Sequence, residues 1–359
     1  MRAVFQISGL SKSYDEKRVL EDIGLKINIG EIFCILGPSG AGKTTLLRLL
    51  NCLEKPNNGS IYFNGTNLMT ARGAELLSIR RKMALVFQEG AVFNASVYDN
   101  VAYGLKVRGI GREEIRKKVK EALEIVGLRG YAKRNARTLS GGEKQRVTFA
   151  MAAVLEPEVL LFDEPTANLD PINEEIINEI MLRINALGIT MVFTTHKQEE
   201  ALSLATRIAV INKGRFEQIG APEDIFYRPA TPFVARFVGA ENILEGVVKS
   251  SSIAVNGIEL KVPGVMARVG ETVIICIRPE EILLLRENIP PTRAYPNVVK
   301  GRITRMSPYG KALIRLLLEV DKGLILKADV PRHVVRVMKL EVGKEIKASL
   351  KPESCHVIA

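Results

Sequence analysis

The sequence predicts an α/β domain followed by a smaller all-β domain, and three features of the chain indicate this arrangement. In the larger, amino-terminal part, short β-branched apolar runs alternate with amphipathic helical stretches, as is typical of α/β domains. After Gly239 the sequence changes to short strand-like runs separated by Gly, Pro and Asn. The 359 residues also fit two or three domains of roughly 100–200 residues each. We therefore expect one domain over residues 1–239 and a second over residues 240–359.

The strands and helices of the first domain follow from their apolar patterns. Short, fully apolar runs indicate buried strands at Ile32–Leu36, Val159–Phe162, Thr190–Thr194 and Ala205–Asn212. Apolar residues that recur on one helical face indicate helices at Lys43–Leu53, Glu113–Val126 and Glu174–Leu187. Because these strands and helices alternate along the chain, we expect a layered α/β domain.

The second domain contains an internal repeat. Residues 242–248 are echoed by residues 297–303, and residues 269–280 are echoed by residues 342–353. The offsets are 55 and 73 residues, so the second copy has a longer middle section. Two copies are too few for a solenoid, which needs about three or more repeats. Short strands in two copies predict a small β-barrel or a pair of them.

The composition places the chain among ordinary globular proteins, with 47% hydrophobic and 25% charged residues. Its apolar runs are shorter than the ~18 residues that a membrane-spanning helix needs, and the amino-terminal residues do not resemble a secretion signal. Three histidines argue against a histidine-built metal centre. The four cysteines are far apart and are expected to be reduced thiols; they are Cys34, Cys52, Cys276 and Cys355.

The net charge of +11 is spread over both predicted domains. Residues 1–239 hold 32 basic and 27 acidic residues, and residues 240–359 hold 19 and 13. The smaller domain is therefore the more basic one per residue. The charge alone is compatible with nucleic acid, with an acidic membrane surface, or with no specific partner.

Residues 37–44 fit the phosphate-binding pattern G-x-x-x-x-G-K-[ST], between a predicted strand and a predicted helix. The glycines let backbone N–H groups surround phosphates, and the helix amino terminus adds a favourable dipole. Lys43 is expected to reach the β- and γ-phosphates, and the Thr44 hydroxyl to ligate Mg²⁺. The alternative is a glycine-rich turn that binds nothing, but the flanking strand and helix argue against it. The predicted nucleotide-binding residues here are Gly37, Pro38, Ser39, Gly40, Ala41, Gly42, Lys43, Thr44 and Thr45.

Two carboxylates end the apolar run at 159–162. A buried strand brings such residues to its carboxyl end, where α/β sheets bind their ligands. Asp163 suits Mg²⁺ coordination, and Glu164 suits a general base that polarises the attacking water. A strand that ends in Asp-Glu is usually only a solvated strand end, but the phosphate loop favours the functional interpretation.

Residues 139–146, Leu-Ser-Gly-Gly-Glu-Lys-Gln-Arg, open another predicted helix. Ser140 is a helix-capping residue, and Gly141 and Gly142 leave backbone N–H groups exposed as a second anion site. With this motif, residues 4–239 resemble the ATP-hydrolysing subunit of an ATP-binding-cassette (ABC) transporter, whose signature reads Leu-Ser-Gly-Gly-x-x-x-Arg. The resemblance implies a P-loop NTPase fold with a helical subdomain.

Four further positions match the family's pattern in order, and their roles come from the resemblance. Tyr14 matches the aromatic residue that stacks on adenine. Gln88 matches the glutamine that links the Mg²⁺ site to the membrane subunits, so it is expected to act both as a metal ligand and in catalysis. Asp170 matches the loop that crosses the dimer interface, and His196 matches the switch histidine at the γ-phosphate.

The resemblance also implies cofactors and partners. ATP and Mg²⁺ are the expected cofactors, and two copies are expected to dimerise head to tail. Each ATP would then lie between the phosphate loop of one copy and Ser140, Gly141 and Gly142 of the other. The membrane permease would be a separate protein, served indirectly by an extracytoplasmic solute-binding protein. The chain itself would be peripheral, at the cytoplasmic face of the cell membrane.

The transported solute is inferred from two segments. In the family, residues 90–101 receive the coupling helix of the membrane subunit; many sugar and polyamine members carry a Pro-His-Met-type sequence where this chain has Asn-Ala-Ser. The pattern here is similar to that of tungstate and molybdate importers, as is the sequence of residues 343–358. The second domain resembles the OB-like TOBE modules of importers, and its basic charge suits a bound oxyanion. Molybdate or tungstate is therefore expected first, and sulfate, polyamine or sugar are the alternatives.

Three other interpretations compete with this one. The second domain could serve dimerisation alone. A soluble ABC ATPase that acts on nucleic acid or ribosomes would usually carry two cassettes, and the second domain offers only Tyr295 and Tyr309 for base stacking; no nucleic-acid partner is therefore expected. A ligand sensor without hydrolysis conflicts with the presence of Lys43 and Glu164.

Overall fold

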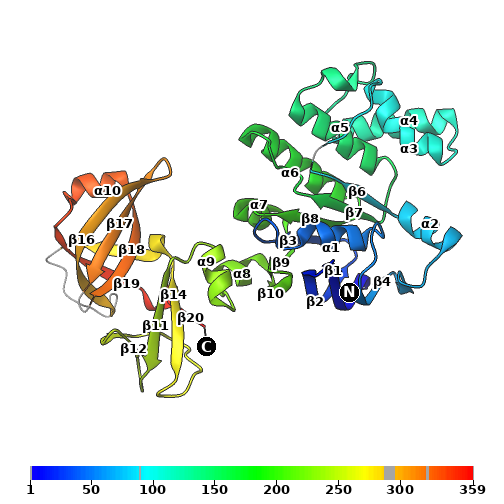
Figure 1. Ribbon diagram of the computed structural model, residues 1–359. Coiled ribbons are helices and arrows are strands. Elements are labelled where there is room, and N and C mark those ends of the chain that lie inside the picture. Colours follow the sequence, from blue (N-terminus) through cyan, green and yellow to red (C-terminus); the bar gives the residue numbers. More distant parts are fainter. Residues whose placement is uncertain (1, 89, 287–295, 321–322, 359) are drawn as a thin grey trace. The chain divides into compact units, whose positions relative to one another are not determined.

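The computed structural model describes residues 2–88, 90–286, 296–320 and 323–358 (Figure 1). Tyr295, which the sequence offered for base stacking, lies outside these residues.

The chain forms two compact units, Met1–Pro222 and Glu223–Ala359. Helix α8 (Pro222–Tyr227) therefore begins at the last residue of the first unit, and α9 (Pro232–Phe237) lies in the second unit. The boundary that the sequence suggests, at residue 239, follows these helices and stays a prediction.

A six-stranded sheet forms the centre of the first unit. Its five strands from β9 to β6 are parallel, and β10 is antiparallel to β9. In spatial order the strands are β10 (Arg215–Gly220), β9 (Arg207–Asn212), β3 (Ile32–Leu36), β8 (Thr190–Thr195), β7 (Val159–Asp163) and β6 (Met83–Val86). Strands β3, β7 and β8 are buried along their whole length, as their continuous apolar sequences predict.

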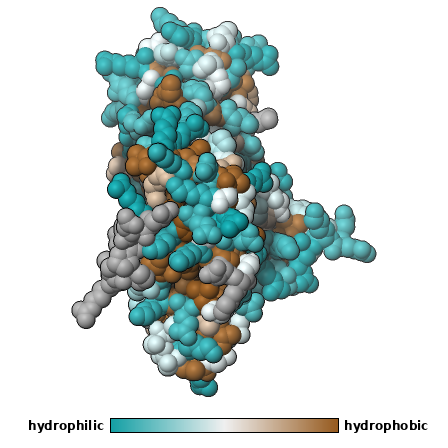
Figure 2. Space-filling view, turned by 90° about the vertical axis from the view of Figure 1, so that its left-hand side faces the viewer, coloured by the Kyte–Doolittle hydropathy of each residue, from teal (hydrophilic) through white to brown (hydrophobic). Residues whose placement is uncertain are grey.

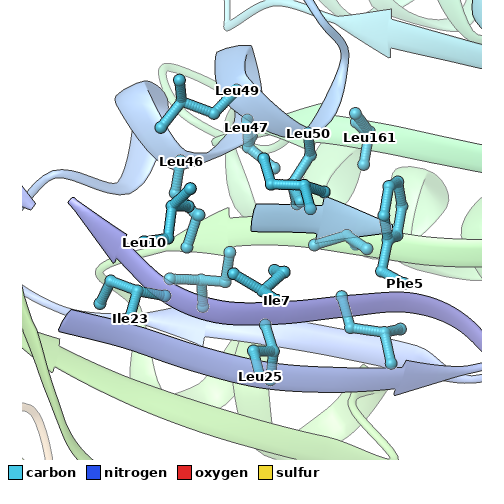
Figure 3. Packing of buried hydrophobic residues seen from close by; sticks show 14 of the residues in the cluster. Phe5, Ile7, Leu10, Ile23, Leu25, Leu46, Leu47, Leu49, Leu50 and Leu161 are labelled. Atoms are coloured by element: carbon cyan, nitrogen blue, oxygen red, sulfur yellow. The ribbon is translucent and has the colours of Figure 1, made fainter. Parts of the chain in front are cut away.

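A second, antiparallel sheet packs with the first through helix α1 (Lys43–Leu50). Its strands in spatial order are β2 (Lys17–Asn28), β1 (Ala3–Tyr14), β4 (Asn58–Phe63) and β5 (Thr66–Asn67). The α1 leucines share one hydrophobic cluster with residues of both sheets, such as Leu10 and Leu161; Figure 3 labels Leu46, Leu47, Leu49 and Leu50 of this helix. Each is fully buried, and burial of a leucine contributes roughly 1.5–3 kcal/mol, so this core fixes the phosphate loop that precedes α1.

The remaining helices of the first unit include a helical subdomain, which the family resemblance predicted. Helices α3, α4 and α5 pack on one another and lie together at one end of the unit (Figure 1). The bounds are α2 (Gly73–Arg81), α3 (Val97–Val107), α4 (Arg112–Ile125), η1 (Ala136–Thr138), α5 (Gly141–Ala153), α6 (Pro171–Asn185) and α7 (Gln198–Leu204).

Most predicted elements are present, with bounds that differ by a few residues. The helix expected over Lys43–Leu53 ends at Leu50 because Cys52 takes a φ of 56°, which cannot continue a right-handed helix. The N–H of Leu53 then closes the end of the helix on the Arg48 carbonyl at 2.9 Å.

The described residues of the second unit form two five-stranded sheets, which confirms the all-β prediction apart from its short helices. The first sheet is, in order, β13 (Ile258–Leu260), β12 (Ile253–Val255), β11 (Asn242–Val248), β14 (Thr272–Ile277) and β20 (His356–Ile358). The second is β18 (Leu324–Pro331), β17 (Leu313–Val320), β16 (Val298–Tyr309), β19 (Glu345–Leu350) and β15 (Ile282–Leu285). The unit's described residues also form the helix α10 (Arg332–Val337) and the 3₁₀ turns η2 (Pro279–Glu281) and η4 (Pro352–Ser354).

The two sheets have the same strand order, as the repeat in the sequence predicts, but their last strands are exchanged. Strand β15 follows the first copy in sequence and pairs with β19 of the second copy. Strand β20 follows the second copy and pairs with β14 of the first. One continuous hydrophobic core joins both sheets, for example through Ile275 and Leu318. The repeats are therefore interlocked in a single fold.

The face seen in Figure 2 is largely hydrophilic, with apolar side chains in patches. In the second unit the exposed apolar side chains include Ile325, Val337 and Val342. Among the described residues, the helices are all too short or too polar to cross a bilayer.

Candidate functional site

The predicted site residues follow the carboxyl ends of adjacent parallel strands. Leu36 lies opposite Thr195, Asp163 opposite Thr194, and Val86 opposite Phe162 in the sheet register. The chain continues from these positions into the phosphate loop, the switch-histidine segment, Glu164 and Gln88. The parallel register is thus the reason why residues far apart in sequence meet at one edge of the sheet.

The phosphate loop is held in shape by its glycines. Gly40 and Gly42 have φ angles of 78° and 103°, which favour glycine. Gly37 lies so close to the Ile211 carbonyl of β9 that a Cβ would overlap it. Gly42 leaves a Cβ only 2.8 Å from the carbonyl oxygen of Val19. The loop therefore needs glycine at these positions, for its backbone angles or for close packing.

Lys43 begins helix α1 and is 95% buried, at 5% relative exposure. Its ammonium donates hydrogen bonds to the carbonyl oxygens of Gly37 at 2.9 Å and Pro38 at 3.1 Å. It also lies 3.2 Å from Oε1 of Glu164. The charge at the centre of the phosphate loop is thus placed next to the predicted general base.

The carboxyl end of β7 is fixed by its neighbour β8. The hydroxyl of Thr194 donates a 2.7 Å hydrogen bond to Oδ1 of Asp163. The N–H of Glu164 is in turn 3.0 Å from the same hydroxyl and 3.1 Å from the Thr194 carbonyl. Thr194 therefore holds both carboxylate-bearing residues in position.

Glu164 itself adopts a left-handed backbone with a φ of 48°. Such angles are uncommon for a residue with a side chain and concentrate at functional sites. The turn points its carboxylate at two groups, with Oε2 lying 3.2 Å from Nδ1 of His196 and Oε1 facing Lys43. The structure therefore brings Lys43, Glu164 and His196 together.

The residues expected around Mg²⁺ offer donors that suit this ion. They are the carboxylate of buried Asp163, the hydroxyl of Thr44 and the amide oxygen of Gln88, and Mg²⁺ prefers oxygen ligands. Within the described ranges, no group of three His, Cys, Asp or Glu side chains forms a ready metal cage. Mg²⁺ usually binds one or two protein ligands together with phosphates and water, so the residues fit a nucleotide-bound ion.

The signature segment forms a regular helix start. Ser140 caps α5, accepting a hydrogen bond from the N–H of Glu143, while the Glu143 carboxylate accepts one from the N–H of Ser140. The hydrogen bond from the Ser140 backbone is the largest cause that lowers the pKa of Glu143. Gly141 is exposed with open space around it, whereas Gly142 is buried against Asn173 of α6.

Asp170 lies next to the signature segment rather than next to Lys43. It caps helix α6, with Oδ1 accepting from the N–H groups of Ile172 and Asn173 at 3.1 and 3.0 Å. The backbone hydrogen bond from Asn173 is the first cause that lowers the pKa of Asp170. Because Asn173 also packs on Gly142, Asp170 and the signature helix share one neighbour.

Tyr14 lies at the end of β1, partly exposed at 40%. Its hydroxyl donates a hydrogen bond to Glu54 and is also hydrogen-bonded to Thr45 in α1. Partial burial, followed by the bond to Glu54, raises the pKa of Tyr14. The ammonium of Lys12 lies 4.8 Å from the ring centroid. The tyrosine is thus anchored next to the helix that follows the phosphate loop.

Two residues that organise this region, Thr194 and Gln145, have no role predicted from the sequence. Gln145, in the signature helix, is buried and donates a 3.1 Å hydrogen bond to the carbonyl of Pro165, directly after Glu164. Its position inside the signature motif was a signal for this role. The partner of Thr194 could not be found without knowing that β7 and β8 are neighbours.

A glycine-built phosphate loop between β3 and α1, with a carboxylate pair at the end of β7, defines a P-loop nucleotide-binding domain. Residues 20–167 match the ABC transporter family, and residues 294–357 match the TOBE domain. The chain is 38% identical over 356 residues to the molybdate/tungstate import ATP-binding protein WtpC of Pyrococcus abyssi, and 37% identical to that of Pyrococcus horikoshii. The alignments cover 99% of this chain and at least 99% of each relative. The chain therefore belongs to the ABC transporter family.

Solved structures agree with this assignment. The cbiO1 protein of Clostridium perfringens, part of the ABC transporter complex cbiONQ, is 32% identical with a TM-score of 0.60; the match covers 64% of this chain and 92% of that protein. The ATP-binding cassette MJ0796, described as dimeric and bound to ADP and Pi, is 31% identical with a TM-score of 0.56, covering 61% and 98%. The roles of individual site residues in this chain stay predictions.

Proposed function

We propose that this chain is the ATP-hydrolysing subunit of an importer for molybdate or tungstate. The observation that carries the proposal is the meeting of Lys43, Glu164 and His196 at one edge of the sheet, in a chain similar to WtpC proteins over its whole length. Sulfate, polyamine and sugar are the alternative solutes.

In this mechanism Lys43, Glu164 and His196 each have a separate role in ATP hydrolysis. Glu164 takes a proton from the water that attacks the γ-phosphate, and its left-handed turn aims the carboxylate. His196, at 3.2 Å from that carboxylate, contacts the γ-phosphate, and Lys43 stabilises the charge on the β- and γ-phosphates. Thr44, Asp163 and Gln88 would hold Mg²⁺, which would supply positive charge to the phosphate oxygens.

The proposal includes a head-to-tail homodimer around ATP. Ser140 and Gly141 are exposed at the start of α5, where the N–H groups of Gly141 and Gly142 and the helix dipole favour an anion. A second copy would present these groups to the γ-phosphate held by the first. The dimeric form described for the related cassette MJ0796 supports this arrangement. ATP would then stabilise the dimer, and hydrolysis would release it.

The segment after Gln88 suits a permease contact. The loop of residues 93–96 is built around buried Asn100, whose amide bonds the Phe93 carbonyl at 3.2 Å and the Ser96 carbonyl at 2.9 Å. Phe93 and Tyr103 are about half exposed, and their rings lie 5.0 Å apart. A rigid loop with exposed aromatic residues is typical of a protein interface. Binding to a permease here would place the chain peripherally at the cytoplasmic face of the membrane. The extracytoplasmic solute-binding protein would then act on this chain only indirectly, through the permease.

Transport assays test the proposal directly. The chain would be purified together with its permease in proteoliposomes, and uptake of tungstate, molybdate and sulfate would be measured with and without ATP. We expect ATP-dependent uptake of tungstate or molybdate, and permease-stimulated ATPase activity that the exchange Phe93→Ala weakens while basal hydrolysis persists. ATPase activity that responds to RNA and not to the permease would contradict the proposal.

The second unit would bind an oxyanion as a regulatory signal in the same proposal. Its excess of basic residues and its match to the TOBE domain support this role. Calorimetry of the full chain with tungstate, molybdate and sulfate tests it. We expect heat of binding with tungstate or molybdate and none with sulfate. No heat of binding with any of the three anions would leave the second unit with dimerisation as its role.

A further inference from the structure

A buried carboxylate outside the predicted catalytic set, Glu200, lies beneath the segments that carry Glu164 and His196. Glu200 is in helix α7 and is only 2% exposed. Its Oε1 accepts a 2.7 Å hydrogen bond from the hydroxyl of Thr166, a residue that is itself buried. Thr195 is a second hydrogen-bond partner of the same carboxylate. A buried carboxylate is costly unless such partners satisfy it, so this position demands the two threonines.

The two partners sit beside the catalytic residues. Thr166 is two residues after Glu164, and Thr195 directly precedes His196. The hydroxyl of Thr195 also accepts the N–H of Lys197 at 3.0 Å, and its carbonyl accepts the N–H of Gly37 at 3.2 Å. Glu200 is therefore connected to the general base, the switch histidine and the start of the phosphate loop.

Lys197 joins the same hydrogen-bond network through the backbone of Thr166. Its ammonium donates to the Thr166 carbonyl at 3.3 Å and to Glu174 of α6 at 2.5 Å. Burial raises the pKa of Glu200, while the two threonines and Lys197 act in the opposite direction. The positive charge thus offsets part of the cost of a carboxylate at this depth.

We propose that Glu200 is a positioning residue for ATP hydrolysis, which holds the Glu164 and His196 segments at a fixed separation through Thr166 and Thr195. The inference rests on the proposed ATPase function. The 3.2 Å contact between Glu164 and His196 is made by two loops, and loops that are tied only at their ends move independently. A shared anchor removes that freedom, so both groups keep the geometry that the transition state requires.

Steady-state ATP hydrolysis by variants of the full chain tests the proposal. We expect Glu200→Ala and Thr166→Val to lower kcat by roughly 10- to 100-fold while KM for ATP changes less than about threefold, because only the transition-state geometry is affected. Thr166→Ser keeps the hydroxyl and should restore most of kcat. The matched control is Glu199→Ala, an exposed glutamate one residue earlier in the same helix.

Two further measurements separate positioning from simple packing. The double variant Thr166→Val with Glu200→Ala should be no slower than the slower single variant, because both remove the same link. Hydrogen exchange without nucleotide should show faster exchange at residues 164–166 and 195–197 in Glu200→Ala, and unchanged exchange in β3 and β9. Equal kcat values for Glu200→Ala and Glu199→Ala, or exchange that rises evenly over the whole first unit, would overturn the proposal. An unmodified chain without ATPase activity would overturn the proposed function, whereas the exchange data would still decide whether Glu200 holds the two segments.

Discussion

Asn242 and Asn297 occupy equivalent positions in the two repeats of the second unit, and each hydrogen-bonds the backbone of the other repeat. Asn242 exchanges bonds with the N–H and carbonyl of Lys327, at 2.7 and 2.9 Å. Asn297 makes the same pair of bonds to Lys261, also at 2.7 and 2.9 Å. Both side chains are nearly fully buried, at 3% and 2% exposure. The internal symmetry of the unit is thus expressed in two reciprocal contacts.

We predict that Asn242→Ala and Asn297→Ala each destabilise both repeats. The change removes the two hydrogen bonds to the partly buried backbone of Lys327 or Lys261, and each lost hydrogen bond costs roughly 0.5–1.5 kcal/mol. Hydrogen exchange in increasing urea should show earlier opening of both sheets in each variant. Ser251→Ala, at an exposed bend of the same unit, is the control. Loss of protection in one sheet alone would show that the repeats are not coupled.

Glu164→Gln should bind ATP but hydrolyse it very slowly. The amide keeps the shape of the side chain and cannot accept the proton of the attacking water, so turnover should fall roughly 10²- to 10⁴-fold. With ATP the variant should elute as a dimer in size-exclusion chromatography, since the nucleotide is no longer consumed. Glu179→Gln, on the exposed face of α6, should behave like the unmodified chain. Normal turnover in Glu164→Gln would refute the assignment of the general base.

The two signature glycines should respond differently to an added methyl group. At Gly142 a Cβ would overlap the end of the Asn173 side chain, so in Gly142→Ala this side chain must turn away, which should lower the stability of the first unit slightly and disturb Asp170. At Gly141 there is open space, so Gly141→Ala should keep the stability and lower ATP-dependent dimerisation and hydrolysis. Thermal unfolding and ATPase assays on both variants test this. Equal effects of the two exchanges on stability would contradict the packing argument.

Stability of the second unit should decrease as the pH falls below about 6.5, because of His356. Burial lowers the pKa of this imidazole, and the positive charge of Arg228 lowers it further, although the hydrogen bond to the Pro229 carbonyl opposes both. A base with a lowered pKa in the folded state binds its proton more readily when unfolded. The contribution of His356 to the stability of the folded unit is therefore complete above the pKa of the unfolded state, about 6.5. This contribution is lost as the pH falls through the lower pKa of the folded state.

Urea unfolding of the second unit between pH 5 and pH 7.5 measures this effect. His356→Asn should flatten the pH dependence, whereas His333→Asn, at an exposed position of α10, should leave it unchanged. An equally steep profile in His356→Asn would assign the dependence to other groups.

The sequence predicted those parts of the fold that depend on local pattern. Strand β3 lies at Ile32–Leu36 as expected, because a short apolar run between two glycine-containing loops can be placed by its own composition. The repeat in the second unit was also visible, since its two copies share residues at matching positions. The phosphate loop was identified because its chemistry requires glycines at fixed spacing.

Pairings between distant segments could not be predicted in the same way. The sequences of β15 and β20 do not specify that each strand pairs with the opposite repeat. By local pattern, either strand could have completed the sheet of the repeat that it follows. Glu200 was equally hidden, since its partner Thr166 is 34 residues away and an acidic residue in a short helix is usually solvated. Such contacts are decided by tertiary packing, which local propensity does not encode.

The exchange of β15 and β20 has a consequence for the order of events during synthesis. Strand β20, at His356–Ile358, completes the first sheet of the second unit. It leaves the ribosome after all the other strands of both sheets, because it follows them in sequence. Until then β14 has an unpaired edge, which is a template for pairing with other chains. The second unit therefore matures late, and a nascent chain stalled before residue 356 would expose an aggregation-prone strand that the finished protein covers.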